Sequence, residues 1–358
     1  MYLKTINQLQ SYVDQLEIKE KDQLMIIVGE QSSKVIYDLI SYLNSKNINF
    51  FGGIFPSLLV ETQDIREGFI VHKYHSYFTS LVAPNLLSVD VDLDSIGSCT
   101  AIVFADGLSS KMKELTDTIY NKLGNRVTYV GGGAGFYDLE HRPCIFNNEG
   151  VFEDVAVVSI IPNQSTLCVK HGWEKLAGPF SITKSNENTL TEIDCRNAFD
   201  VYQEIIENEE DIILYSTDFF EIAKDHPFGI VKNTGQELVV RDPIALNEKG
   251  EIICIADVPE NSVIYVLKGK KDTLLNSSME VARECSMNAP MKYHPLLFDC
   301  ISRAMFLGEF FKQELTNIQS KLKYPLEGAL SIGEISSLKN GMLEIHNKSS
   351  ILGLLDIA

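Results

Sequence analysis

The chain has 358 residues, of which 45% are hydrophobic and 22% are charged, so it is long enough for two packed domains of ordinary globular composition. Its formal net charge of −18 argues against binding to DNA or to anionic membranes, because both need a basic surface. The longest apolar runs are strand-sized, well short of the roughly 20 residues of a membrane span. We therefore expect neither a nucleic acid nor a membrane as a partner.

The opening segment, residues 1–23, is amphipathic and mixed in charge, and it lacks the apolar core of a secretory signal. Seven cysteines are scattered along the sequence without a CxxC pair: Cys99, Cys144, Cys168, Cys195, Cys254, Cys285 and Cys300. An odd number of unpaired cysteines indicates a reduced protein with mostly buried thiols. A cytoplasmic location is therefore expected.

Three stretches predict a strand, an amphipathic helix and a second strand: residues 24–55, 100–136 and 296–335. The expected apolar helix faces are Val35, Ile36, Leu39, Ile40 and Leu43 in the first, Met112, Leu115, Ile119 and Leu123 in the second, and Met305, Phe306, Phe310 and Leu315 in the third. Units of this size normally hold parallel strands with a right-handed crossover. Their recurrence favours an ancient duplication, although such units are also common in α/β proteins generally.

Material of antiparallel character lies between these units. Residues 151–173 predict two strands joined by a Pro-Asn turn, and residues 237–269 predict a meander. A helix over residues 196–208 opens the second half. The predicted fold is therefore α/β (mixed α+β), with two related halves, 1–190 and 191–358, each holding a mixed sheet with β-α-β units and helices packed outside.

The run VTYVGGGAGF, residues 127–136, ends a predicted strand in glycines. It does not fit a dinucleotide fingerprint, because Phe136 and Leu139 occupy positions that require glycine, and no Walker A triplet exists. Glycines at a strand end let the backbone approach a ligand or a neighbouring strand closely. A tight turn without a ligand is the alternative.

Metal and hydrolase motifs are weak. His72 and His75 lie three residues apart in VHKYHSYF, but no carboxylate or thiol stands at ligand spacing nearby, so solvent-facing histidines and no metal site are expected. GxSxG and HExxH are absent from the sequence, and SxxK occurs too often to be informative. No cofactor is expected.

Polar residues gather at predicted strand ends: Asp299, Cys300, Ser302 and Arg303 in FDCISR, Glu334 in SIGEI, His346 and Asn347 in LEIHNKSS, and Arg241 and Asp242 in VVRDPI. A helix start favours anions and lowers the pKa of a nearby thiol, and arginine can bind a carboxylate by two hydrogen bonds. Glu334 can pair with an ammonium group, so the set suits a zwitterion. Each residue also fits a structural role, as a turn, a cap or a small buried thiol.

Taken together, these segments resemble the FIST family, a sensory input domain of bacterial signalling proteins. The resemblance covers nearly the whole chain and rests on the strand ending in Gly131 and Gly132, then VFEDVAVVSI, HGWEKLAGPFSITKS, NTLTEIDCRNAFDVYQEI, HPFGI, LVVRDPI, the Cys300–Arg303 element, EGALSIGEI and IHNKSS. Two positions depart from the family pattern. Cys195 stands where glycine is usual, and Ser302 stands where a small glycine-like residue is usual.

The resemblance implies binding of a small ligand, with amino acids or related metabolites proposed for the family, and it does not imply catalysis. Family members are often fused to kinase, cyclase or chemoreceptor domains. This sequence carries none of them, so a signalling partner of that kind is expected to be a separate protein. The expected ligand-binding residues are Arg241, Cys300, Arg303, Glu334, His346, Asn347, Gly131 and Gly132.

Two other functions remain open at this stage. One is a hydrolase or transferase with Cys300 as nucleophile and His346 as base, which requires the two side chains to meet. The other is a scaffold that binds only protein partners through an exposed apolar patch.

Overall fold

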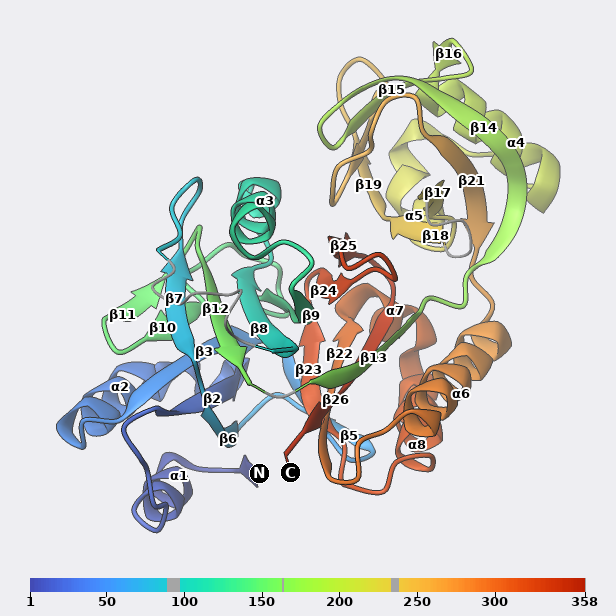
Figure 1. Ribbon diagram of the computed structural model, residues 1–358. Coiled ribbons are helices and arrows are strands. Elements are labelled where there is room, and N and C mark those ends of the chain that lie inside the picture. The colour runs from blue at the N-terminus through green and yellow to red at the C-terminus, as the bar shows by residue number, and fades with distance from the viewer. Residues whose placement is uncertain (89–96, 163, 233–237, 358) are drawn as a thin grey trace.

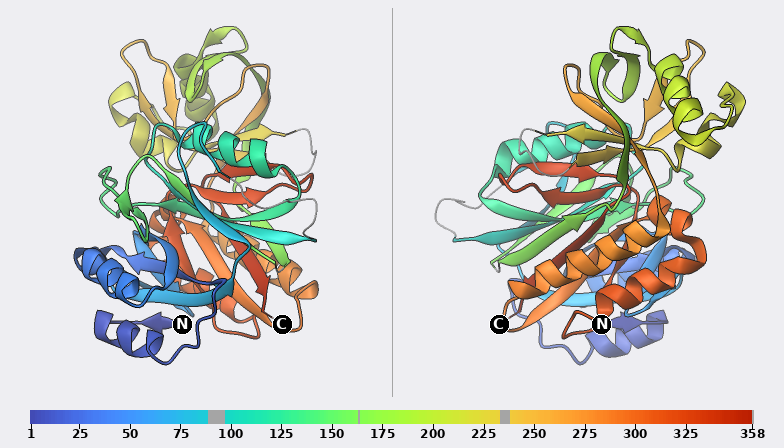
Figure 2. Two further views of the ribbon diagram at one scale, coloured as in Figure 1. Left: turned by 60° about the vertical axis from the view of Figure 1, so that its left-hand side comes forward. Right: turned by 90° about the vertical axis from the view of Figure 1, so that its right-hand side faces the viewer.

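The computed structural model describes residues 1–88, 97–162, 164–232 and 238–357. Three mixed sheets form a large body, and residues 174–268 form a small body that lies at one end of it (Figure 1). Both termini lie at the end of the large body that faces away from the small body, as the views in Figures 1 and 2 agree. The predicted α/β fold with mixed sheets is confirmed.

Each sheet of the large body has six strands arranged around a central parallel pair. The first sheet has the order β1 (Tyr2–Leu3), β6 (Phe69–His75), β2 (Asp22–Gly29), β3 (Asn49–Phe55), β10 (Ile145–Asn147) and β11 (Gly150–Phe152). The second has β25 (Leu343–His346), β24 (Glu334–Ser337), β9 (Val127–Ala134), β8 (Cys99–Asp106), β12 (Ala156–Ile161) and β7 (Phe78–Val82). The third has β13 (Ser165–Lys170), β26 (Ser350–Asp356), β22 (Tyr293–Cys300), β23 (Glu327–Ser331), β4 (Ser57–Val60) and β5 (Gln63–Ile65).

The parallel pairs are the three predicted β-α-β units. Their connecting helices are α2 (Ile36–Ser45), α3 (Met112–Leu123), and α7 (Ile301–Leu307) followed by α8 (Phe311–Gln319). Helix α1 (Ile6–Val13) packs on the first sheet, and α6 (Lys271–Met287) contacts β13, β26 and α8 on the outer face of the third sheet, visible at the right of Figure 2. The predicted apolar faces of α2 and α3 are buried in the core, apart from the partly buried Val35 and Met112.

The predicted face of the third unit is wrong in part. Met305 is 47% exposed and Phe310 is 41% exposed, whereas Leu315 is fully buried. Gly308, with φ of +56°, ends α7, and a short 3-10 turn precedes α8, so one helical period does not run through the segment. The buried residues of the two helices include Ile301, Leu307, Phe311, Leu315 and Ile318.

Strand pairing crosses the middle of the sequence. Strand β24 pairs with β9, β4 pairs with β23, and β13 pairs with β26. Strands β12 and β13, predicted as a joined pair, therefore belong to different sheets, and Asn163 of their predicted turn lies outside the described residues. The sheets of the large body are built from both halves of the sequence. The domain limits 1–190 and 191–358 stay a prediction.

The small body is an antiparallel sheet covered by helices α4 (Ala198–Glu210) and α5 (Phe219–Ala223). Its strand order is β18 (Leu238–Arg241), β17 (Phe228–Val231), β21 (Val263–Lys268), β14 (Glu174–Asn186), β15 (Thr189–Ile193), β20 (Ile252–Cys254) and β19 (Pro243–Leu246), with β16 (Arg196–Asn197) paired to β15. Tyr202 of α4 packs edge-on against Phe219 and Phe228 in its core.

An aromatic cluster joins the three sheets of the large body. Phe55 of β3, Phe104 of β8 and Phe298 of β22 have ring centroids 5.3 to 6.0 Å apart. All three rings are buried, and each such pair contributes about 0.5–1.5 kcal/mol beyond its buried area. The cluster fixes the relative position of the strand ends that carry the polar residues described next.

Candidate functional site

A buried polar cluster lies where the carboxyl ends of β22 and β23 meet β24, the β25–β26 turn and the small body. We call it the junction cluster, and its members are Asp242, Cys300, Ser302, Glu334, Asn347 and Lys348. All are buried except Ser302, which is partly exposed. Carboxyl ends of parallel strands are the usual ligand-binding edge of α/β sheets.

A chain of contacts connects the cluster from the small body to the large one. Lys348 Nζ lies 3.1 Å from Asp242 Oδ2, and the Asp242 carboxyl group lies near Ser302. The Cys300 thiol lies 3.1 Å from Ser302 Oγ, and the Glu334 carboxyl group lies near this thiol. The junction cluster thus gathers five groups: the ammonium of Lys348, the carboxyl groups of Asp242 and Glu334, the hydroxyl of Ser302 and the thiol of Cys300.

Local structure explains the placement of Glu334 and Lys348. Glu334 begins β24 directly opposite Gly132 of β9, and its carboxyl oxygens accept hydrogen bonds from Ser331 Oγ at 2.9 Å and Ser349 N at 3.3 Å. Lys348 has a φ of +53° in the tight turn between β25 and β26. That turn directs its ammonium group to the Lys224 carbonyl at 2.9 Å as well as to Asp242.

Burial sets the protonation states of the cluster. It raises the pKa of Glu334 well above the usual value, and the nearby Asp299 adds to the effect. It also raises the pKa of Asp242, although Lys348 opposes the shift. The pKa of the Cys300 thiol rises to about 12, so the expected lowering at the helix start is wrong because desolvation outweighs it.

Two acceptors in this region lack a donor. Asp242 Oδ1 and Asn347 Oδ1 are buried, and neither has a hydrogen-bond partner among the residues that the structure describes. Leaving a buried polar atom unpaired costs about 1–3 kcal/mol. An additional donor, from a ligand or a water molecule, would remove this cost.

The structure brings some of the predicted site residues together. Cys300 and Glu334 lie near each other, and the Gly132 backbone pairs with that of Glu334. A Cβ on Gly131 would lie 1.7 Å from the Val103 carbonyl oxygen, so this glycine serves close approach to a neighbouring strand. The tight-turn alternative is wrong for Gly131 and Gly132, since both lie inside β9.

Arg241 and His346 adjoin the cluster with other partners. Arg241 binds Glu344 at 2.8 Å and the Ile345 carbonyl at 3.1 Å, which links the small body to β25. His346 Nε2 lies 2.8 Å from Ser336 Oγ, and burial lowers the pKa of this imidazole to about 4. Both side chains are buried.

Arg303 belongs to a separate network among α6, α7 and α8. Its guanidinium lies 2.6 Å from Glu314 and 3.7 Å from Asp299, and it donates to the Leu274 carbonyl and to Ser277. All of these charged groups are fully buried. Arg303 therefore forms an internal ion pair with Glu314 in the helix layer.

Asp242, Ser302 and Lys348 were not among the predicted site residues. Asp242 and Ser302 stood out in the sequence as polar residues next to strands, but Lys348 carried no signal. A lysine in a polar turn is normally exposed, and its burial follows only from the packing of the small body on the β25–β26 turn.

The cysteine-hydrolase alternative is not supported by these contacts. The Cys300 thiol hydrogen-bonds with Ser302, and no hydrogen bond within the described residues joins it to His346. A thiol with a pKa of about 12 and no imidazole bonded to it is not an activated nucleophile.

A described hollow lies elsewhere. Its volume is about 480 Å³, at the amino ends of β8 and β9, and its lining includes Asn125, Arg126, Thr128, Ser165 and Lys339. None of the predicted site residues lines this hollow. The candidate site is therefore identified by the buried polar residues of the junction cluster.

The comparisons with known proteins agree with this two-part α/β architecture. The FIST N domain family model matches residues 57–196, and the FIST C domain family model matches residues 198–337. The chain therefore belongs to the FIST family, and the predicted resemblance is confirmed. FIST domains are sensory domains of signal transduction proteins.

A search of curated proteins found no match to this chain. Within the described residues, no helix combines the length and the apolar character needed to cross a membrane. The departure at Cys195 has a structural consequence: its φ is +59°, in the left-handed region where glycine is unstrained. That conformation explains why glycine suits this position.

Proposed function

We propose that this chain is a cytoplasmic sensor that binds a small zwitterion, an amino acid or a related metabolite, at the junction cluster. The observation that carries the proposal is the pair of unpaired buried acceptors, Asp242 Oδ1 and Asn347 Oδ1, near a buried lysine. A ligand ammonium group would donate to Asp242 Oδ1, and a further ligand or water donor would pair with Asn347 Oδ1. A ligand carboxylate would share the positive charge of Lys348.

Ligand entry would start at Ser302, the partly exposed member of the cluster, and would require the small body to move. The contacts that hold it in place are ion pairs: Arg241 and Lys232 with Glu344, and Lys348 with Asp242. A ligand that binds Asp242 and Lys348 would replace the ion pair between them and so weaken the attachment of the small body. The position of the small body is then the signal, read by a separate partner such as a kinase, a cyclase or a chemoreceptor.

A thermal-shift screen against the common amino acids and small carboxylates tests the proposal. A ligand present at one hundred times its Kd stabilises the folded protein by about 2.7 kcal/mol, which gives a clear shift in Tm. Asp242→Asn and Asn347→Ala should reduce the shift, whereas Asp64→Asn, an exposed change in β5, should leave it unchanged. No stabilisation by any compound, or equal stabilisation of all variants, would contradict the proposal.

A further inference from the structure

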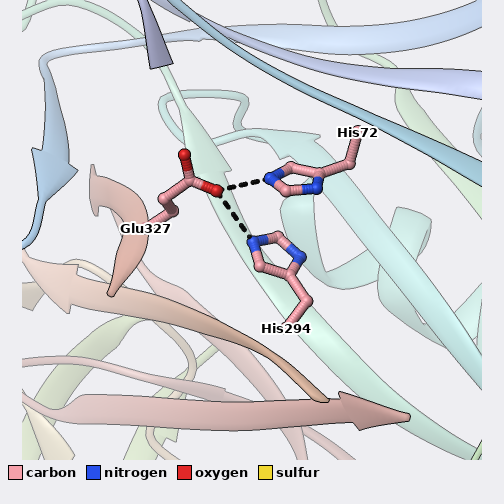
Figure 3. A group of neighbouring side chains, drawn as sticks. All are labelled: His72, His294 and Glu327. Atoms are coloured by element: carbon pink, nitrogen blue, oxygen red, sulfur yellow. Dashed lines mark hydrogen bonds and ion pairs between the residues drawn. The ribbon is translucent and has the colours of Figure 1, made fainter. Parts of the chain in front are cut away.

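Two histidines and a glutamate converge at the other end of the third sheet (Figure 3). His294 lies near the amino end of β22, Glu327 begins β23, and His72 comes from β6 of the first sheet. His294 and Cys300 are six residues apart on one strand, about 20 Å at 3.3 Å per residue. The group is therefore distinct from the junction cluster.

The imidazole nitrogens point at one carboxylate oxygen. His294 Nε2 lies 3.1 Å from Glu327 Oε2, His72 Nε2 contacts the same oxygen, and Figure 3 shows both rings directed toward it. The two rings are stacked with centroids 3.6 Å apart and an interplanar angle of 27°. All three ligand atoms lie within 4.8 Å of one another.

We propose that His72, His294 and Glu327 bind a divalent transition-metal ion of the zinc type. Two imidazoles and one carboxylate form a known catalytic zinc set, with bonds of about 2.0–2.2 Å. Tetrahedral bonds of that length place ligand atoms about 3.3 Å apart, close to the His294–Glu327 spacing. His72 contacts the oxygen more closely than this, so a small outward shift of its ring admits the ion.

The surroundings hold the ligands in the required form. Tyr74 Oη lies 2.5 Å from His294 Nδ1, and a hydrogen bond there fixes the ring with Nε2 toward the ion. Tyr74, His294 and Glu327 are all buried, which limits the movement of these side chains.

A fourth position is open to an amine or to water. The amino group of Met1 lies 2.7 Å from His72 Nε2 and 3.0 Å from Glu327 Oε1. An entering ion would displace this amine from His72 and Glu327. The prediction of solvent-facing histidines is wrong for His72, whose side chain is only 23% exposed and contacts Glu327. This remaining exposure leaves the site accessible from solvent.

The test is a titration of chelator-treated protein with Zn²⁺, followed by calorimetry, and with Co²⁺, followed by its visible absorption. The proposal predicts one ion per chain with a Kd in the micromolar range or tighter. His72→Ala and Glu327→Gln should each weaken binding at least tenfold. The matched control is His75→Ala, on the same strand but half exposed and outside the group.

His141→Ala is a second control, because His141 lies with Asp106 and Asp154 in another group that could hold a cation. Loss of binding in this variant alone would overturn the assignment, as would absence of binding to the wild type at millimolar metal. The Co²⁺ spectrum of the wild type keeps the test valid if a variant fails to fold. A four- or five-coordinate spectrum supports the site, and the spectrum of hexaaqua cobalt contradicts it.

Discussion

Replacing Glu334 with glutamine should make the protein more stable at neutral pH. Burial raises the pKa of this carboxyl group well above its usual value near 4.5, so the folded state holds a proton that the unfolded state loses. Stability is therefore lost as the pH rises from about 4.5 to the pKa in the fold, at about 1.36 kcal/mol per pH unit. If the group stays protonated at pH 7, the loss reaches about 3 kcal/mol, and glutamine, which has no proton to lose, avoids it.

The assay is urea unfolding of the wild type and of Glu334→Gln at half-unit steps from pH 4.5 to pH 8. The two free energies should be similar near pH 4.5 and diverge in favour of the variant as the pH rises. Glu309→Gln, an exposed change near α8, is the matched control and should follow the wild type. Parallel pH profiles for the wild type and Glu334→Gln would refute the reasoning that this buried group stays protonated.

Three further predictions concern other residues. Gly131→Ala should lower the free energy of unfolding by more than about 3 kcal/mol or prevent folding, because its Cβ would lie 1.7 Å from the Val103 oxygen. Gly97→Ala, whose Cβ would meet no described atom within 4 Å, should be nearly neutral in the same denaturation assay, and equal effects would contradict the packing argument. Cys195→Gly should raise the free energy of unfolding by about 0.5–1 kcal/mol by relieving the left-handed conformation, and calorimetry showing no rise in Tm would count against it. Thiol-reagent labelling at pH 8 should modify exposed Cys195 much faster than Cys300, whose pKa is about 12, and equal rates would show that Cys300 is not buried as described.

Much of the local structure could be predicted from the sequence. The strand–helix–strand units at residues 24–55 and 100–136 follow from hydrophobic periodicity, which depends only on neighbours within a few turns. The third unit was predicted as one helix, and Gly308 divides it, because a single glycine in an amphipathic pattern does not reveal a left-handed break. Of the predicted site residues, Cys300 and Glu334 lie near each other. Both were predicted from polar residues at strand ends.

What the sequence determined by itself is the set of elements and the chemistry available at their ends. The tertiary structure alone decided which of those ends meet. Glu327 and His72 are 255 residues apart, and they meet because β6 of the first sheet packs beside the third sheet. Lys348 is buried because the small body packs over a turn that is polar in sequence. Periodicity reports which side of an element is apolar, whereas strand order across sheets is set by the packing of the whole chain, and no local pattern contains that information.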